Sequence, residues 1–321
     1  MQATALLGLR AVAPIHAGSD DARGAVDLPI QREKHNNWPV VFASSVKGAL
    51  REACSKRASG QIDVAALFGL ADKEDPDKAT QDKAEQNKAE QNKTDKNRPG
   101  MQAGALLVSD MQLLALPVAS LDQAFRWVTC PGALARLARC WARFGMAPSA
   151  CPELATGLKP DRAYHFDDGL PAGKNLFLRE YCFTAERADA SLAPWLGLLA
   201  HLFGPHTAEE ELRKRLVIVS DAHFSFLAES ATSVAPHIKL NENKTTVDGA
   251  MFFEETLPPE TLMFLPLACV DERKTDAAQT GPQLMAQLLA CFAGGRQFLR
   301  VGGNETTGMG WFELHVCKGQ S

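Results

Sequence analysis

The chain has 321 residues, of which 45% are hydrophobic and 22% are charged, and its formal net charge is −4. These values fit a globular protein with one large domain or two small ones, and no apolar run reaches the roughly 18 residues of a transmembrane helix. The acidic balance argues against a nucleic-acid binder, which is often basic overall, unless positive charge is concentrated in particular loops.

Hydrophobic periodicity predicts strands and helices in mixed order, separated by long loops. The predicted elements, in chain order, are a strand at 3–13, a polar loop at 14–37, a helix at 44–57, a strand at 105–114, helices at 132–144 and 192–203, a strand at 216–227, a helix at 283–292, and strands at 297–301 and 311–316. This order predicts an α+β fold with an antiparallel sheet and large insertions.

Residues 72–99 form a low-complexity segment with a five-residue repeat, marked by Lys78, Lys83, Lys88 and Lys93. A period of five matches neither a helix nor a strand, and the segment has no large apolar residue to bury. We predict a disordered insertion on the surface. Acidic and basic residues nearly balance within it, which favours a solvated spacer over a basic arm.

The cysteines are widely scattered, and the lack of any C-x-x-C pair argues against a structural zinc site. We expect reduced, mostly buried thiols in a cytoplasmic protein. The eight residues are Cys54, Cys130, Cys140, Cys151, Cys182, Cys269, Cys291 and Cys317.

Three segments carry candidate chemistry. In "VFASSVKGALREA", Ser44 or Ser45 can cap the helix, and Lys47 and Arg51 share one face. Hydroxyls and a cation at a helix N-terminus suit an anion, although an ordinary capped amphipathic helix has the same pattern. In the loop before it, "GAVDLPIQRE", apolar residues flank Asp27, which makes this residue a candidate positioned carboxylate in an ordered loop.

The segment at residues 234–254 has the pattern of a hairpin, with polar "NENKTT" between two strand-like arms. Lys239 lies on one arm and Lys244 near the tip. A protruding basic hairpin can contact a polyanion, and lysine on an edge strand can equally prevent aggregation. Both readings stay open on the residues alone.

The C-terminal stretch "LRVGGNETTGMGWFEL" contains Gly302, Gly303, Gly308 and Gly310 between two predicted strands. Glycine costs conformational entropy on folding, so this loop requires either a tight turn or a close backbone approach to something else. Either the rest of the protein or a ligand phosphate can be the group approached.

Taken together, "VDLPIQREKHNNWPVVFASSVKGALRE", "TTVDGAMFFEETLP" and "GGNETTGMGWFEL" resemble the backbone subunit of type III-B CRISPR RNA-silencing complexes, a member of the RAMP superfamily. The resemblance extends through "AGALLVSDMQLLALPVAS", "FRWVTCPGALARLAR" and "LVIVSDAHFSFL". Two features depart from the family. Phe42-Ala43 stands where the family usually has Pro-Gly before the paired serines, and the repeat at 72–99 has no counterpart.

The resemblance implies one RAMP domain over residues 1–321, with a ferredoxin-like core similar to an RNA-recognition motif and a projecting thumb hairpin at 234–254. Copies would stack along a guide CRISPR RNA as a helical filament, together with other subunits of the effector complex. In the family, main-chain N–H groups of the glycine-rich loop reach RNA phosphates. The RNA-binding residues that this implies are Ser44, Ser45, Lys47, Arg51, Lys239, Lys244, Gly302, Gly303, Thr306, Thr307, Gly308 and Gly310.

The resemblance also implies metal-dependent cleavage of a single-stranded target RNA paired with the guide, carried by Asp27. The chemistry is attack by a ribose 2′-hydroxyl on the adjacent phosphate, which requires an in-line geometry that the thumb would impose. A carboxylate is a poor general base at neutral pH, so Asp27 is expected to hold a hydrated Mg²⁺ or Mn²⁺. His16 matches another residue near this site and could transfer a proton, touch a phosphate or merely end the first strand.

Two other functions remain open. The chain could be a non-catalytic filament subunit that binds RNA, or a nuclease of the same superfamily that processes guide RNA. Asp27 within "VDLPI" favours the catalytic backbone subunit over the first, and the hairpin segment with "VDLPIQRE" favours it over the second.

Overall fold

The computed structural model describes residues 2–19, 24–57, 62–70, 102–145, 158–273, 279–295 and 297–318. The predicted insertion at 72–99 and Cys151 lie outside these residues.

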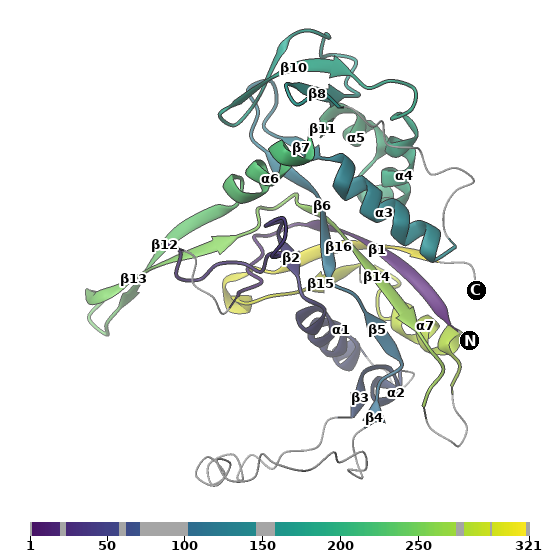
Figure 1. Cartoon of the computed structure of the whole chain (residues 1–321). Helices are drawn as coiled ribbons and strands as arrows, with labels where there is room; N and C mark the ends of the chain where they lie inside the picture. Colours follow the sequence, from purple (N-terminus) through teal and green to yellow (C-terminus); the bar gives the residue numbers. More distant parts are fainter. Residues whose placement is uncertain are drawn as a thin grey trace, which may run out of the picture.

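Four antiparallel strands and two helices form the centre of the molecule (Figure 1). They follow one another as β1 (Ala3–Ala11), α1 (Ala43–Arg57), β6 (Met111–Val118), β14 (Leu262–Cys269), α7 (Gly281–Ala290) and β16 (Trp311–Lys318). In space the strands lie in the order β16, β1, β14, β6, and each neighbouring pair is antiparallel. All eight side chains of β14 are buried, as expected for a strand that is covered on both faces.

The sheet continues beyond this centre at both edges. β15 (Phe298–Arg300) pairs with β16 at one edge, and the other edge extends in the order β7 (Arg126–Thr129), β11 (Leu216–Ile218), β8 (Arg162–His165), β10 (Tyr181–Arg187) and β9 (Asn175–Leu178). The pairs β7–β11 and β8–β10 are parallel. The predicted antiparallel sheet therefore holds for the four central strands, whereas the whole sheet is mixed, because helices between β7 and β11 return the chain to the same end of the sheet.

Short strands pair at the margins of this sheet or with each other, and helices pack against it. β2 (Val40–Val41) pairs with β6, β5 (Leu106–Val108) pairs with β14, and β3 (Gly69–Leu70) pairs with β4 (Gln102–Ala103). Figure 1 shows α1, α2 and α7 on one side of the central strands and α3 to α6 above them, where α4 packs against β1 and β16 and α3 against β6. The bounds of the further helices are α2 (Val64–Phe68), α3 (Pro131–Arg143), α4 (Pro194–Phe203), α5 (Glu209–Arg215) and α6 (Asp221–Ser230).

Most predicted elements are confirmed, but the segment at 216–227 is not a single strand. β11 ends at Ile218, and α6 begins at Asp221, after Ser220 caps it by accepting a hydrogen bond from the N–H of His223. The buried residues of α6 then recur at helical spacing, as Phe224, Leu227 and Ala228. The predicted strand at 105–114 is likewise divided into β5 and β6.

The cysteines of the described residues are all free thiols, and most are buried. A hydrogen bond with Cys291, whose sulfur lies 2.7 Å away, and burial raise the pKa of the Cys54 thiol. Burial raises the pKa of Cys317 to about 11. The expected burial is therefore confirmed for Cys54, Cys130, Cys269, Cys291 and Cys317, whereas Cys182 is exposed. Within the same part of the chain, none of the helices has the length and apolar character needed to span a membrane.

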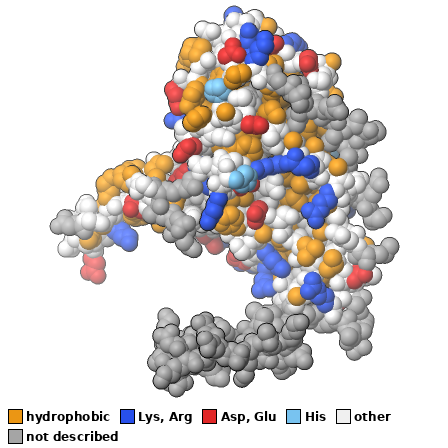
Figure 2. Space-filling model, viewed as in Figure 1, with side chains coloured by type: hydrophobic (Ala, Val, Ile, Leu, Met, Phe, Trp, Pro, Cys, Tyr) orange, Lys and Arg blue, Asp and Glu red, His pale blue; other side chains and the backbone are white. Residues whose placement is uncertain are grey.

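A hairpin of β12 (Ser233–Leu240) and β13 (Thr246–Thr256) projects from the body (Figure 1). This element confirms the predicted hairpin at 234–254. Its register places Ser233 opposite Thr256 and Ile238 opposite Met251. Figure 2 shows hydrophobic side chains along the upper side of this projection, and the exposed apolar residues of the hairpin are Val234, Ile238, Val247 and Met251.

A buried ion pair fixes the root of the hairpin to the loop that precedes α1. Arg32 Nη2 lies 2.5 Å from Glu255 Oε1, and the two residues are only 7% and 6% exposed. Glu255 also accepts hydrogen bonds from the N–H of Ile30 (3.1 Å) and the hydroxyl of Thr232 (2.7 Å). Arg32 Nη1 donates to the carbonyls of Asn37 and Ala228, so both charged groups have polar partners in addition to each other.

Two phenylalanines of α6 test whether this segment is a helix. Phe224 is fully buried against Trp38, whereas Phe226 is 57% exposed. We expect Phe224→Ala to lower the free energy of unfolding by about 3–5 kcal/mol and Phe226→Ala to change it by less than about 0.5 kcal/mol, as measured by urea denaturation. Residues two apart lie on the same face of a strand, so equal losses would contradict the helix.

The ion pair at the hairpin root gives a second prediction. Arg32→Ala leaves the Glu255 carboxylate buried without its cation and should cost about 3–5 kcal/mol of unfolding free energy. The matched control is Lys56→Ala, which removes the exposed pair Lys56–Glu52 and should cost only about 0.3–0.5 kcal/mol. A loss for Arg32→Ala as small as that of the control would show that the pair does not hold the loop.

Candidate active site and RNA-binding surface

Asp27 is held at the outer edge of the hairpin by the backbone of β13. The N–H of Leu28 donates to the carbonyl of Phe253 (3.0 Å), and the N–H of Glu255 donates to the carbonyl of Leu28 (2.9 Å). Next to these two bonds, the N–H of Phe253 donates to Asp27 Oδ2 at 2.8 Å. The Asp27 side chain is exposed, so the carboxylate is fixed in place and still open to a ligand.

A hollow of about 380 Å³ brings Asp27 together with a cation of the hairpin. Asp27 and Leu28 line one part of it, and Lys239, Phe252 and residues 249–251 line the rest. Lys239 Nζ lies 6.0 Å from the centre of the Phe252 ring. An acid, a base and an aromatic ring thus share one surface, which suits a phosphate together with a nucleobase.

His16 lies five residues beyond the end of β1, so the expectation that it merely ends the first strand is wrong. Its Nδ1 atom lies 2.8 Å from the carbonyl oxygen of Glu255 and 3.5 Å from Glu254 Oε1. The Glu254 carboxylate also lies 3.1 Å from His237 Nε2 and accepts a hydrogen bond from Asn304 Nδ2.

Sequence reasoning missed Glu254 and His237. The signal for Glu254 was a carboxylate in the alternating pattern of "AMFFEE", on the same strand face as Phe252.

The donors around Asp27 limit the kind of metal site that is compatible with them. Among the residues that the structure describes, no group of three or more His, Cys, Asp and Glu side chains could hold a metal ion. A single exposed carboxylate does not make a protein-only cage. It fits a hydrated Mg²⁺, which keeps several waters and is typically bound by one or two carboxylates together with substrate phosphates.

The glycine-rich loop packs on the segment that carries His16. A Cβ atom at Gly302 would lie 2.4 Å from the carbonyl oxygen of His16, and Gly302 has a φ of +97°. The N–H groups of Gly303, Gly308 and Gly310 donate to the carbonyls of His16, Glu305 and Pro14. The expectation that these three N–H groups reach RNA phosphates is therefore wrong, because carbonyls within the chain already occupy them.

The hydroxyl groups of this loop differ in their surroundings. Thr307 Oγ1 donates to the carbonyl of Asn304 at 2.8 Å, and Thr306 is exposed. Both lie in the short 3₁₀ helix η4 (Glu305–Thr307). An RNA contact by either threonine stays a prediction, and Thr306 is the more accessible donor.

The start of α1 also differs from the expectation. The helix begins at Ala43, so Ser44 and Ser45 lie in its first turn and are not its cap. The N–H of Ala43 donates to Asp110 Oδ1 at 2.7 Å, so a carboxylate of the protein occupies this position. Gln31 connects this turn to the His16 segment, because its Nε2 donates to the Gly18 carbonyl (2.9 Å) and to Ser45 Oγ (3.4 Å).

Lys47 and Arg51 lie on one face of α1, as predicted, but that face contacts the protein. Arg51 Nη2 donates to the carbonyls of Phe68 (2.9 Å) and Gly69 (3.0 Å). Partial burial, and then the positive charges of Arg51 and Arg273, lower the pKa of Lys47. Arg51 therefore has a structural task, whereas Lys239 and Lys244 on the hairpin are exposed. RNA binding by these four cations remains a prediction.

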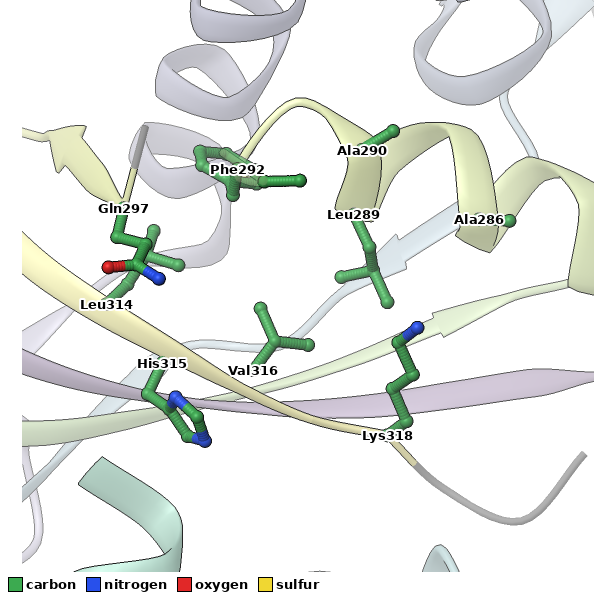
Figure 3. A pocket seen from close by; sticks show the side chains of 10 residues that line it. Ala286, Leu289, Ala290, Phe292, Gln297, Leu314, His315, Val316 and Lys318 are labelled. Carbon is green, nitrogen blue, oxygen red and sulfur yellow. The ribbon is translucent and has the colours of Figure 1, made fainter. Parts of the chain in front are cut away.

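A second hollow of about 380 Å³ lies between α7 and β16 (Figure 3). Leu289 of α7 and Val316 of β16 face each other across it, with Gln297 and Lys318 toward opposite ends. Its lining contains no carboxylate and none of the predicted site residues. The hollow beside Asp27 is therefore the better candidate for chemistry on RNA.

Comparisons with known proteins identify relatives over nearly the whole chain. The model of the RAMP superfamily matches residues 9–313. The CRISPR system Cmr endoribonuclease Cmr4 of Pyrococcus furiosus is 30% identical over 313 residues, which cover 96% of this chain and 94% of that protein.

Solved structures agree with this match. The crystal structure of oligomeric Cmr4 from Pyrococcus furiosus has a TM-score of 0.69 at 23% identity and covers 99% of both chains. Another crystal structure of Cmr4 has a TM-score of 0.66 at 25% identity, over 99% of this chain and 100% of that one. A chain of type III-B Cmr-beta bound to cognate target RNA has the same fold, with a TM-score of 0.68 at 18% identity over 98% of this chain and 96% of that one. The chain therefore belongs to the RAMP superfamily and, within it, to the Cmr4 family.

Proposed function

We propose that this chain is a backbone subunit of a type III-B CRISPR ribonucleoprotein that binds guide RNA and cleaves the target RNA paired with it. The observation that carries this proposal is the position of Asp27, an exposed carboxylate fixed by the N–H of Phe253 beside Lys239. This geometry occurs in a chain that is 30% identical, over nearly its whole length, to a protein named as a Cmr endoribonuclease.

The fold supports this assignment. The β-α-β-β-α-β order, with the strands arranged as β16, β1, β14, β6, is that of a ferredoxin-like core. The β12–β13 hairpin would act as the thumb. Copies of the chain, guide RNA, target RNA and other subunits are the partners that we infer, in keeping with solved structures named as oligomeric Cmr4 and as a type III-B complex bound to target RNA.

The proposed reaction is an attack by a ribose 2′-hydroxyl on the adjacent phosphate. It needs the attacking oxygen, the phosphorus and the leaving oxygen in line, and the projecting hairpin would impose this geometry by displacing a nucleotide from the stack. Asp27 would hold a hydrated Mg²⁺ or Mn²⁺, which supplies positive charge next to the scissile phosphate. Lys239, in the same hollow, would add a second positive charge where negative charge develops.

His16 would act near this centre but not at its surface. It is 9% exposed, and its Nδ1 atom is hydrogen-bonded to the Glu255 carbonyl. Only Nε2 is therefore available for a contact with RNA. We infer that His16 mainly holds Glu254 and the loop at Gly302 and Gly303 in place.

Asp27→Asn tests the catalytic role, because asparagine keeps an acceptor for the N–H of Phe253 and removes the charge. We expect the assembled complex to bind target RNA as before and to cut it at least about 10²–10³-fold more slowly. Wild-type cleavage should stop in EDTA, return with Mg²⁺ or Mn²⁺, and fail on a target with 2′-deoxyribose at the scissile position. Labelled products should end in a cyclic phosphate and a 5′-hydroxyl.

The control is Asp168→Asn, which changes an exposed carboxylate paired with Arg187 and should leave cleavage unchanged. Cleavage of the 2′-deoxy target at the normal rate would overturn the internal nucleophile. If Asp27→Asn cuts normally, His16 is the next residue to test. A wild-type complex that binds target RNA without cutting it would favour the non-catalytic filament subunit.

Two cations that both belong to the predicted RNA-binding set should behave differently. Lys244→Gln, at the exposed hairpin tip, should reduce the slope of log affinity against log salt by about 0.7 for single-stranded RNA and leave stability unchanged. Arg51→Gln removes two hydrogen bonds to carbonyls and should cost about 1.5–3 kcal/mol of unfolding free energy. A salt titration and urea denaturation measure the two effects, and the reverse pattern would contradict the assignment.

A further inference from the structure

The proposed reaction needs a group that protonates the leaving 5′-oxygen, and no residue has yet been assigned to this step. When the P–O5′ bond breaks, the departing alkoxide must receive a proton, and a positioned general acid typically contributes about 10²–10⁴-fold to such a step. Asp27 is committed to the metal ion. Lys239 contributes charge. A side chain that exchanges protons near neutral pH is needed, and imidazole is the group that does so.

A general acid must have a fixed orientation, and two contacts fix the ring of His237. Its ring stacks on Phe252, with centroids 5.3 Å apart and an interplanar angle of 19°. Its Nε2 atom lies 3.1 Å from Glu254 Oε2, and the two side chains are 39% and 3% exposed. The buried carboxylate thus fixes Nε2, while Nδ1 makes no hydrogen bond to any residue that the structure describes.

The hairpin register places His237 on the same surface as the Asp27 hollow. His237 lies directly opposite Phe252 in the β12–β13 pair, so both side chains point to one face. The regular pairing is interrupted after Ile238, and Lys239 Nζ lies 6.0 Å from the centre of the Phe252 ring. Phe252 and Lys239 line the hollow with Asp27. Asp27 bonds the outer backbone edge of β13, whereas His237 belongs to the strand on its inner edge. The two groups therefore flank Phe252 from opposite sides.

This arrangement matches the demand of an in-line displacement, in which the nucleophile and the leaving group lie on opposite sides of the phosphorus. Four charged or titratable groups lie around His237. Glu254 contacts its ring, and His16 contacts the same Glu254 carboxylate. Lys239 and Asp27 lie beside Phe252, on which the His237 ring stacks. His16 is less suited to the task, because it is buried and its Nδ1 atom is bonded to the Glu255 carbonyl.

We propose that His237, oriented by Glu254, is the general acid of target cleavage; this inference rests on the proposed function. The 2′-oxygen forms a bond to phosphorus and releases its proton to solvent. The P–O5′ bond breaks, and O5′ takes the proton from Nδ1 of the imidazolium to become the 5′-hydroxyl. The neutral imidazole then regains a proton from water, so that atoms and charge balance over the cycle.

A target RNA with sulfur in place of the scissile 5′-bridging oxygen tests this role, because a thiolate leaves without being protonated. The assembled complex carries His237→Gln, Lys239→Gln or Asp27→Asn, and each is compared with wild type on the oxygen and the sulfur target. We expect His237→Gln to be slowed by about 10²-fold or more on oxygen and to cut the sulfur target at nearly the wild-type rate. Lys239→Gln should be slowed by similar factors on both targets, and Asp27→Asn should fail on both.

The other outcomes overturn the proposal in distinguishable ways. His237→Gln that cuts the oxygen target at the wild-type rate removes His237 from the reaction. Equal slowing on both targets shows that His237 contacts or positions RNA but donates no proton. If the sulfur target restores cleavage by Lys239→Gln and not by His237→Gln, the general acid is Lys239. If the wild-type complex cuts neither target, the proposed function itself fails. Binding of target RNA by His237→Gln, measured in parallel, separates loss of chemistry from loss of folding.

Discussion

The buried ion pair between Arg32 and Glu255 is the contact on which the candidate site depends. It ties a long polar loop to the root of a hairpin that otherwise projects from the body. The same stretch of loop is bonded to β13 through the backbone of Leu28, and there the N–H of Phe253 meets Asp27. A loop carboxylate gains a defined position because its neighbours act as an additional strand, which is an arrangement that favours preorganised chemistry.

Strand alternation divides two adjacent glutamates between two tasks. Glu255 points to Arg32 and stabilises the fold, whereas Glu254 points to the opposite face and contacts His16, His237 and Asn304. The consecutive carboxylates therefore cannot replace each other. The face that carries Glu254 is polar and aromatic, and the other face of the hairpin exposes Val234, Ile238 and Met251. One hairpin thus presents two chemically distinct surfaces.

The elements that could be predicted from the sequence are those whose residues follow a local pattern. The helix at α1, the central strands and the hairpin follow from periodicity and turn residues, and Asp27 stood out because apolar residues flank it. The helix α6 was missed because Val217, Val219 and Phe224 also fit a strand, and only the cap at Ser220 separates the two elements. Glu254 and His237 were missed because the contact between their side chains depends on the register of the hairpin. The use of the glycine N–H groups was predicted wrongly because sequence does not reveal which acceptor lies opposite a loop.

The position of β1 has a consequence for how the chain is made. The strand lies between β14 and β16, so both of its neighbours are encoded after residue 261. A ribosome that adds about 5–20 residues per second needs roughly 12–50 s to move from the end of β1 to the start of β14. Throughout that interval, a strand in which most side chains are destined for the core has neither of its partners. The central pairing of the sheet can therefore form only when translation is almost finished, after every other element except α7, β15, η4 and β16 has been made.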